Sequence, residues 1–200
     1  MRDEIQVVAA TPDRALDALK VFEGSGERDC WCQYWRQSSS DYGSGAHGPG
    51  QAVLLKQVET GPPPGMIAYV EGQAVGWLGL WPRERFERLV RSRTILKIDD
   101  QAVWSIVCFK IRVGYRRRGV ARALLAGAID FARRERVPAL EAYPIDSEGK
   151  HMDTATAYVG FTHMFEAVGF RRVCETEART AGRPRIAMRL ELREGELTAD

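Results

Sequence analysis

The 200-residue sequence lacks long hydrophobic runs, contains few cysteines and carries almost no net charge. No stretch approaches the length of apolar chain that a transmembrane helix requires, so we expect no membrane association. The first residues, MRDEIQVVAATPD, lack a basic region followed by an apolar core, which argues against a secretory signal. The cysteines number only four (Cys30, Cys32, Cys108 and Cys174), so we expect free thiols and a cytoplasmic location.

The charge balance restricts the partners of the protein. Lysine and arginine total 29 against 27 aspartate and glutamate residues, which gives a net charge of +2. Such a balance gives no reason to expect a general nucleic-acid binder. Hydrophobic residues make up 44% and charged residues 28% of the chain, as in ordinary globular proteins. We therefore expect residues 1–200 to form a single domain.

Metal binding is not expected. Tetrahedral zinc needs four ligands, usually with cysteines in CxxC-type spacing, whereas Cys30 and Cys32 are separated by one residue. The three histidines (His47, His151 and His163) are not spaced to complete such a site. A disulfide between Cys30 and Cys32 is disfavoured in a reducing cytoplasm.

Hydrophobic periodicity predicts a mixed fold. Strands are expected at 5–9, 102–113 and 140–145, hairpins at 66–80 and from 171–178 to 186–192, and helices at 12–23, 51–58, 120–136 and 162–168. Residues 38–50 are almost all turn formers and predict a mobile loop. This order predicts an α/β (α+β) fold with a mixed, largely antiparallel sheet flanked by helices.

Three consecutive arginines, Arg116 to Arg118, directly precede the helix predicted at 120–136. A helix N-terminus already carries partial positive charge, so these arginines add like charge where it costs stability. An anion would reverse that cost, and Gly119 would let the backbone approach it closely. The loop lacks both GxxxxGK[ST] and GxGxxG. It therefore predicts a phosphate or pyrophosphate site of another kind, with a solvated basic turn as the alternative.

The segment from Arg116 to Ala121, RRRGVA, resembles the acetyl-CoA signature [RQ]-x-x-G-x-[GA] of the GNAT superfamily of N-acetyltransferases. The strand before it ends in Ile111-Arg112-Val113, which resembles the V-x-V of that family. The hairpin AYVEGQAVGWLGL and the later MFEAVGF follow the family order, so the resemblance covers residues 66–192. CWCQYWR at 30–36 also resembles a motif of a bacterial GNAT-like subgroup with no assigned substrate.

This resemblance implies an enzyme that uses acetyl-CoA as acyl donor and transfers the acetyl group directly to an amine of a small molecule or peptide. It implies that a backbone N–H near Phe109 polarises the thioester carbonyl. It places the pantetheine arm along Ile111, Arg112 and Val113. It also implies that the cofactor pyrophosphate is held by Arg116, Arg117, Arg118, Gly119, Val120, Ala121 and Arg122.

The expected proton-transfer residues depart from the family pattern. Many members carry a glutamate base on the long strand, but here that position is Ser105, which is a poor base. Many also carry a tyrosine acid four residues before the Gly-Phe pair, and here that position is Phe165. We therefore expect a water-mediated proton path that ends at His163 or Tyr158. Three further candidates stay open: Glu141, Tyr143 and, as a covalent nucleophile or a packed thiol, Cys108.

The resemblance implies that residues 24–50 and 178–185 frame the acceptor. Stacking or cation–π contacts to a flat or cationic substrate are expected from Trp31, Tyr34, Trp35 and Arg36. The alternative is that Trp31 and Trp35, four positions apart, form the core face of a helix.

Two further functions compete with the enzyme. A GNAT-like fold that binds acyl-CoA without catalysis would act as a regulatory module, and the atypical residues at 105 and 165 favour that alternative. A factor directed to RNA or protein would instead use the arginine loop as its contact surface. A homodimer is an open alternative for the assembly.

Overall fold

In the computed structural model, which describes residues 4–23, 30–147, 149, 152 and 156–192, the strands form one seven-stranded sheet. Its order is β1-β2-β3-β4-β5-β7-β6, and every neighbouring pair is antiparallel except β4 and β5. The strands are β1 (Ile5–Ala9), β2 (Gly65–Val70), β3 (Gln73–Pro82), β4 (Val103–Ile111), β5 (Ala139–Ala142), β6 (Arg171–Thr180) and β7 (Arg183–Glu191).

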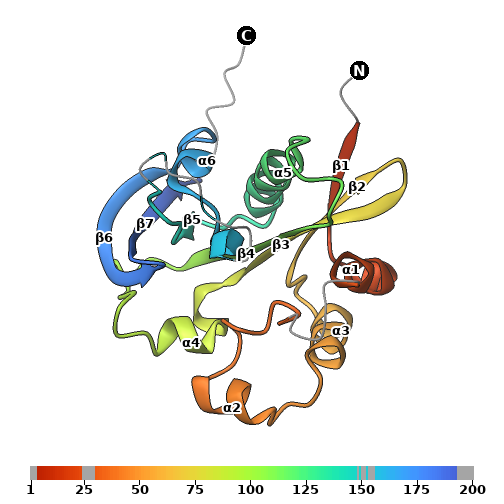
Figure 1. The fold of residues 1–200 in the computed structure, drawn as a ribbon, viewed down its shortest axis with the longest axis horizontal. Coiled ribbons are helices and arrows are strands. Elements are labelled where there is room, and N and C mark those ends of the chain that lie inside the picture. Colours follow the sequence, from red (N-terminus) through yellow and green to blue (C-terminus); the bar gives the residue numbers. More distant parts are fainter. Residues whose placement is uncertain (1–3, 24–29, 148, 150–151, 153–155, 193–200) are drawn as a thin grey trace.

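Helices cover both faces of the sheet (Figure 1). One face is covered by α5 (Val120–Arg134), which contacts β1 to β4, and the other by α1 (Ala15–Phe22), which contacts β3 and β4. On the α1 side also lie α2 (Ser39–Ser44), α3 (Gly50–Thr60) and α4 (Glu87–Val90), whereas α6 (Thr162–Glu166) packs on β7. Single turns of 3-10 helix occupy Pro12–Arg14, Arg83–Arg85 and Thr156–Val159. None of the described helices is long and apolar enough to cross a bilayer.

Alternation along the strands separates two hydrophobic cores. On β3, Trp77 and Trp81 belong to the core beneath α1, whereas Leu78 and Leu80 belong to the core beneath α5. Successive side chains of a strand point to opposite faces, so a strand buried on both faces reads as a continuous apolar run. This is why GWLGLW appears in the sequence without polar interruption.

A β-bulge interrupts this alternation in β4. Gly79 pairs with Cys108 and Leu80 pairs with Ile106, so Val107 is an extra residue without a partner on β3. As a result Val107 and Cys108 both face the α1 core, and Phe109 returns to the α5 core. Bulges re-aim side chains and are frequent beside active sites.

The parallel pair β4/β5 separates just beyond this bulge. The last paired residues are Ile106 and Ala142, although β4 continues to Ile111. The chain after β5 turns away, and Ile145 bridges to Phe161 and to Arg185 instead. In the described part of the chain, residues 107–111 therefore leave their β5-facing backbone edge without a strand partner.

The sheet and its helices confirm the predicted fold class. The predicted hairpins are both present, and their strands extend to 65–70, 73–82, 171–180 and 183–191. The irregular loop predicted over 38–50 is wrong in part, because α2 and the first residue of α3 lie there. Ser38 caps α2 by accepting a hydrogen bond from the backbone N–H of Asp41 at 3.1 Å. Capping by serine is a common start signal that turn-former counting overlooks.

Candidate functional site

The loop before α5 has an unusual backbone. Positive φ angles occur at Gly114 (93°), Arg117 (62°) and Gly119 (87°), and Gly119 is the N-cap residue of α5. No side chain makes a capping hydrogen bond there, and the first turn of α5 contains no acidic residue. The first N–H groups of this 15-residue helix thus form the kind of terminus that binds anions.

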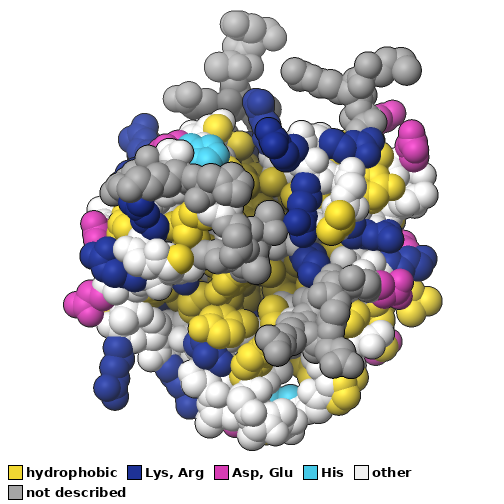
Figure 2. Space-filling view, viewed as in Figure 1, with side chains coloured by type: hydrophobic (Ala, Val, Ile, Leu, Met, Phe, Trp, Pro, Cys, Tyr) yellow, Lys and Arg dark blue, Asp and Glu magenta, His cyan; other side chains and the backbone are white. Residues whose placement is uncertain are grey.

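Arginine side chains surround this terminus. Arg116, Arg117, Arg118 and Arg122 are all exposed. Figure 2 shows lysine and arginine side chains gathered over the loop that precedes α5, beside a strip of hydrophobic surface. Arg116 donates to the backbone oxygen of Ile111 at 3.3 Å, and Arg118 lies 5.1 Å from the ring centroid of Tyr115. The loop therefore combines a helix N-terminus with several exposed arginine side chains next to the end of β4.

Two phenylalanines lie at the separation of β4 from β5. The rings of Phe109 on β4 and Phe165 on α6 meet edge to face, with centroids 6.0 Å apart. Phe165 is fully buried and also contacts Phe170, whereas Phe109 is half-buried. Gly160 permits this packing, because a Cβ there would lie 3.0 Å from the Phe165 ring and 3.3 Å from the Phe109 ring. Phe165 thus belongs to the core, and its apolar ring lies near the point where β4 and β5 separate.

Ser105 lies on the α1 face of β4 and is completely buried. Its Oγ lies 3.5 Å from the hydroxyl of Tyr143, which donates a hydrogen bond of 2.6 Å to Glu141 Oε2. Burial, and then the nearby charge of Glu141, raise the pKa of Tyr143 far above its usual range. Tyr143 therefore stays protonated and keeps donating to the carboxylate.

Glu141 is 1% exposed and is enclosed by two arginines. Arg189 donates to Oε1 from Nε at 3.2 Å and from Nη2 at 2.6 Å, and Arg83 Nε lies 3.8 Å from Oε2. Arg189 also binds Asp99, and this contact holds the pKa of Asp99 near 2. The Glu141 carboxylate is therefore fully paired and serves as an anchor between β5, β7 and the segment after β3.

Tyr158 lies where several elements meet. Its ring packs edge to face on Tyr34 at 6.4 Å, and its hydroxyl is within electrostatic reach of Arg185, Tyr34, Cys108 and Cys30. Burial raises the pKa of Tyr158 to about 12, an effect that Arg185 partly opposes. The phenol is therefore protonated at neutral pH, and the turn that carries Tyr158 packs on β4.

His163 has a different setting. It is exposed on α6, and its ring stacks on Phe161 with centroids 5.8 Å apart and planes 10° apart. Of the two residues predicted to end the proton path, Tyr158 lies on the turn that packs on β4, and His163 lies on the surface of α6.

Cys108 and Cys32 form a buried thiol pair. Their side chains are hydrogen-bonded, and this bond, with the Arg36 guanidinium nearby, lowers the pKa of Cys32. The same bond and burial raise the pKa of Cys108 well above its usual range. Gly79 makes room for the pair, because a Cβ there would lie 2.6 Å from Cys32 Sγ. Cys108 is thus a packed, protonated thiol.

The helix considered for residues 31–35 is wrong. Trp31 and Cys32 have φ angles of 47° and 59°, and residues 30–37 form successive turns. Trp35 is nonetheless buried in the α1 core, and Trp31 packs against that core. Arg36 is 6% exposed; it donates to backbone oxygens of Cys32 and Pro64 and lies 4.5 Å from the Trp81 ring. Arg36 therefore supports the segment from inside.

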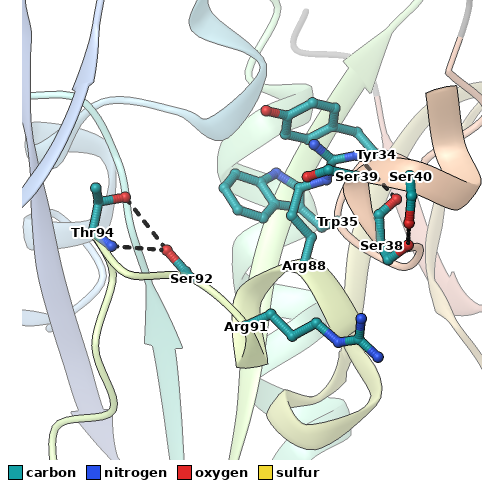
Figure 3. Close-up of a pocket in the computed structure, with 9 residues that line it drawn as sticks. All are labelled: Tyr34, Trp35, Ser38, Ser39, Ser40, Arg88, Arg91, Ser92 and Thr94. Carbon is teal, nitrogen blue, oxygen red and sulfur yellow. Dashed lines mark hydrogen bonds between the residues drawn. The ribbon is translucent and has the colours of Figure 1, made fainter.

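A cavity of about 550 Å³ opens beside this segment (Figure 3). The Tyr34 and Trp35 rings meet edge to face at 5.1 Å, and Arg88 lies 4.1 Å from the Tyr34 centroid. The cavity is lined by Tyr34, Trp35, Ser38, Ser39, Ser40, Arg88, Arg91, Ser92 and Thr94. Aromatic rings, hydroxyls and arginines therefore face the same space.

The structure brings together some of the predicted residues and separates others. Phe109, Ile111 and Arg112 lie at the end of β4, directly before the arginine loop, and Val113 is 81% exposed. Tyr34 and Tyr158 are in contact, whereas Ser105 faces the Glu141 anchor.

Sequence reasoning missed Arg88 and Arg185. Alternate positions of β7 are occupied by Arg185, Ala187 and Arg189. Because alternate residues of a strand share a face, the sequence already indicated that the two arginines lie on the same side of the sheet. Among the described residues, no group of three or more His, Cys, Asp or Glu side chains is arranged to hold a metal.

Comparison with known proteins agrees with this geometry. Residues 28–152 match the model of the Acetyltransferase (GNAT) family. No curated protein sequence matches the chain.

Solved structures share the fold at low sequence identity. The structure of a histone acetyltransferase HPA2 and related acetyltransferase from Corynebacterium glutamicum matches with a TM-score of 0.55 and 19% identity, over 92% of this chain and 94% of that one. Ard1 from Thermoplasma volcanium matches with a TM-score of 0.53 and 15% identity, over 95% and 99%. A GNAT-family acetyltransferase from Streptococcus pneumoniae gives 0.52 and 15%, over 94% and 99%.

The family match covers more than half of the chain, and the sheet, the bulge and the loop before α5 agree with it. The chain belongs to the GNAT family of N-acetyltransferases, which use acetyl-CoA.

Proposed function

We propose that this protein transfers the acetyl group of acetyl-CoA directly to the amine of an acceptor that enters from the α1 side of the sheet. The observation that carries the proposal is the position of the basic α5 N-terminus directly after β4, where β4 has lost its β5 partner. A phosphate-binding terminus and an unpaired strand edge thus lie next to each other, as a long ligand with a pyrophosphate and an amide-containing arm requires.

In this proposal the pyrophosphate binds the first N–H groups of α5 within the 116–122 loop, and the exposed arginines add charge-assisted bonds. The pantetheine amides pair with the free edge of β4 through Ile111, and Arg112 and Val113 border the arm. A backbone N–H near Phe109 polarises the thioester carbonyl, and one such donor contributes roughly 3 kcal/mol of barrier lowering.

The acceptor amine must lose a proton, and the thiolate of CoA must gain one. We assign the second role to Tyr158, because its phenol is protonated and half-buried and its turn packs on β4. The buried Phe165, at the position of the usual family tyrosine, cannot donate. Ser105 contacts the Tyr143–Glu141 pair, so it is not available as a base. We therefore assign the acceptance of the amine proton to water.

The first experiment measures thermal stability across an acetyl-CoA titration for the wild type, Gly119→Glu and Gly182→Glu. Both glycines have positive φ (87° and 76°), and a Cβ at either would meet at most one atom at 4.0 Å. The two variants therefore introduce the same charge and similar backbone strain, but only Gly119 lies at the α5 terminus. A ligand at a hundred times its Kd stabilises the native state by about 2.7 kcal/mol.

We expect a saturable shift in the wild type and in Gly182→Glu that is absent from Gly119→Glu. No shift in a folded wild type would remove the basis of the proposal. A shift without release of thiol in the presence of any amine would instead favour the non-catalytic acyl-CoA-binding module, which the residues at 105 and 165 also suit.

A further inference from the structure

We infer that the acceptor amine carries a carboxylate and that Arg185 binds this carboxylate. The inference rests on the proposed function, because it names the substrate class of that same site.

Arg185 is a buried cation whose terminal nitrogens have no partner among the described residues. It is 5% exposed, and its Nε donates to the backbone oxygen of Tyr143 at 2.8 Å. In the described part of the chain Nη1 and Nη2 make no hydrogen bond, and no acidic side chain pairs with the guanidinium. Burying a charge without compensation is costly, so folded proteins normally pair such groups.

Other arginines of the protein show how unusual that setting is. Arg189 and Arg83 share Glu141, and Arg172 pairs with Asp146 and Glu166. Arg36 is also buried away from acids, but two of its nitrogens bond carbonyl oxygens, and Nη1 is enclosed. Arg36 thus has a structural role inside the protein.

The terminal nitrogens of Arg185 are not enclosed. The enclosed, unbonded side-chain nitrogens of the described chain are Trp35 Nε1, Arg36 Nη1, Trp77 Nε1 and Arg88 Nε. In the described part of the chain Nη1 and Nη2 of Arg185 lack hydrogen-bond partners and do not belong to that set, so part of their surface stays exposed. The guanidinium lies 4.9 Å from the centroid of the Trp35 ring, which holds it in place.

This position is close to the proposed chemistry. The Tyr34 ring contacts both Tyr158 and Trp35, and Arg185 lies over the Trp35 ring. The turn that carries Tyr158 packs on β4. An acceptor whose carboxylate binds Arg185 would place its amine near Tyr158 and the thioester. The planar fork of arginine matches both oxygens of a carboxylate.

The adjacent cavity has the same charge preference. Arg88 faces it from over the Tyr34 ring, donates to the backbone oxygen of Ser38 at 3.3 Å and pairs with no acid in the described chain. None of the nine lining residues is acidic (Figure 3). Arg91 is paired with Glu87, so the uncompensated charge of the cavity is that of Arg88. This charge favours an anionic acceptor over a polycationic one.

The test measures thiol release from acetyl-CoA with each standard amino acid beside its amino acid amide, which keeps the amine and the side chain but lacks the carboxylate. The variants are Arg185→Gln and Arg88→Gln, with Arg133→Gln as a control on the exposed last turn of α5. Acetyl-CoA-dependent thermal shifts verify that each variant is folded and binds the donor.

For at least one pair we expect kcat/KM to be about 10- to 100-fold higher for the acid than for the amide, as charged hydrogen bonds allow. In Arg185→Gln the KM for the acid should rise to that of the amide, while Arg133→Gln should keep the preference of the wild type. Arg88→Gln should weaken the preference, and it supplies the test if Arg185→Gln does not fold.

Equal use of acids and amides, or a preference that survives in Arg185→Gln, would overturn the inference. So would a wild type that binds acetyl-CoA and acetylates none of the panel. A wild type that fails to bind acetyl-CoA would contradict the proposed function itself, so the two failures are distinct.

Discussion

Ser105 on β4 and Glu141 on β5 are direct partners in the parallel pair of strands, and the hydroxyl of Tyr143 lies between their side chains, 3.5 Å from Ser105 Oγ and 2.6 Å from Glu141 Oε2. A carboxylate thus occupies the α1 face beside the position where many family members carry one on β4. Both of its oxygens are engaged, by Tyr143 and by Arg189. The carboxylate therefore orders the sheet, and it is not available as a free base.

Removing the charge of Glu141 should destabilise the protein strongly. In Glu141→Gln the guanidinium of Arg189 and that of Arg83 lose their shared partner inside the protein. Breaking a buried ion pair costs about 3–5 kcal/mol. Urea denaturation should report a loss of that size in the free energy of unfolding.

Asp99→Asn is the matched control for Glu141→Gln, because Asp99 binds the same arginine at the surface. Exposed ion pairs contribute little to stability, so Asp99→Asn should lower the free energy of unfolding much less than Glu141→Gln. Equal losses in the two variants would contradict the view that Glu141 anchors the interior.

Tyr158 should make the folded state sensitive to alkali. Its pKa is about 12 in the folded protein, against about 10 for an unperturbed tyrosine. Between these values the unfolded chain has lost the proton that the native state retains, so stability present below pH 10 declines as the pH rises towards 12. Tyr158→Phe should lose less free energy of unfolding between pH 9 and pH 11 than the wild type.

Urea denaturation at the two pH values checks this prediction. Tyr42→Phe, which removes a hydroxyl from a ring that is 36% exposed, is the control and should follow the wild type. An identical pH dependence in wild type and Tyr158→Phe would show that the Tyr158 phenol ionises as it does in the unfolded chain.

Gly127 allows α5 to approach β1 closely. A Cβ at this position would lie 2.5 Å from Val7 Cγ1 and 2.8 Å from Val7 Cβ. Alanine is the better helix former, by about 1 kcal/mol, but overpacking a core contact costs about 1–3 kcal/mol. We expect Gly127→Ala to lower the free energy of unfolding by up to about 2 kcal/mol.

Gly43→Ala provides the comparison, because Gly43 is helical in α2 and a Cβ there meets nothing within 4 Å. It should be neutral or raise the stability by up to about 1 kcal/mol. Stabilisation by both alanines would mean that helix propensity outweighs the contact with Val7.

Cys108 should not form an acetyl-enzyme. Burial and the bond to Cys32 raise its pKa, so the thiol is not ionised at neutral pH, and thiolate is the reactive form. Mass spectrometry of the protein mixed with acetyl-CoA, without an amine, should therefore show no acetyl group on this residue. An acetyl group present on the wild type and absent from Cys108→Ala would replace direct transfer by a covalent route.

The order of strands and helices, and the basic loop before α5, could be predicted because their signals are local. Periodicity shows which faces are buried, and three arginines before a helix conflict with its dipole unless an anion is present. The short helix α2 was missed because its serine cap lies among turn formers. The family position at 165 could be located by counting from the Gly-Phe pair, but its burial could not.

By itself the sequence determined the fold class, the family resemblance and the position of the loop proposed to bind an anion, since these depend on spacing within a few turns or strands. Only the tertiary structure decided which predicted residues meet. It paired Ser105 with Glu141, placed the Cys32 thiol beside that of Cys108 across 76 positions of chain and packed the turn of Tyr158 on β4. Among the described residues it left the terminal nitrogens of Arg185 without an acidic partner. Register and burial set these contacts, and both are properties of the assembled sheet, which no local pattern contains.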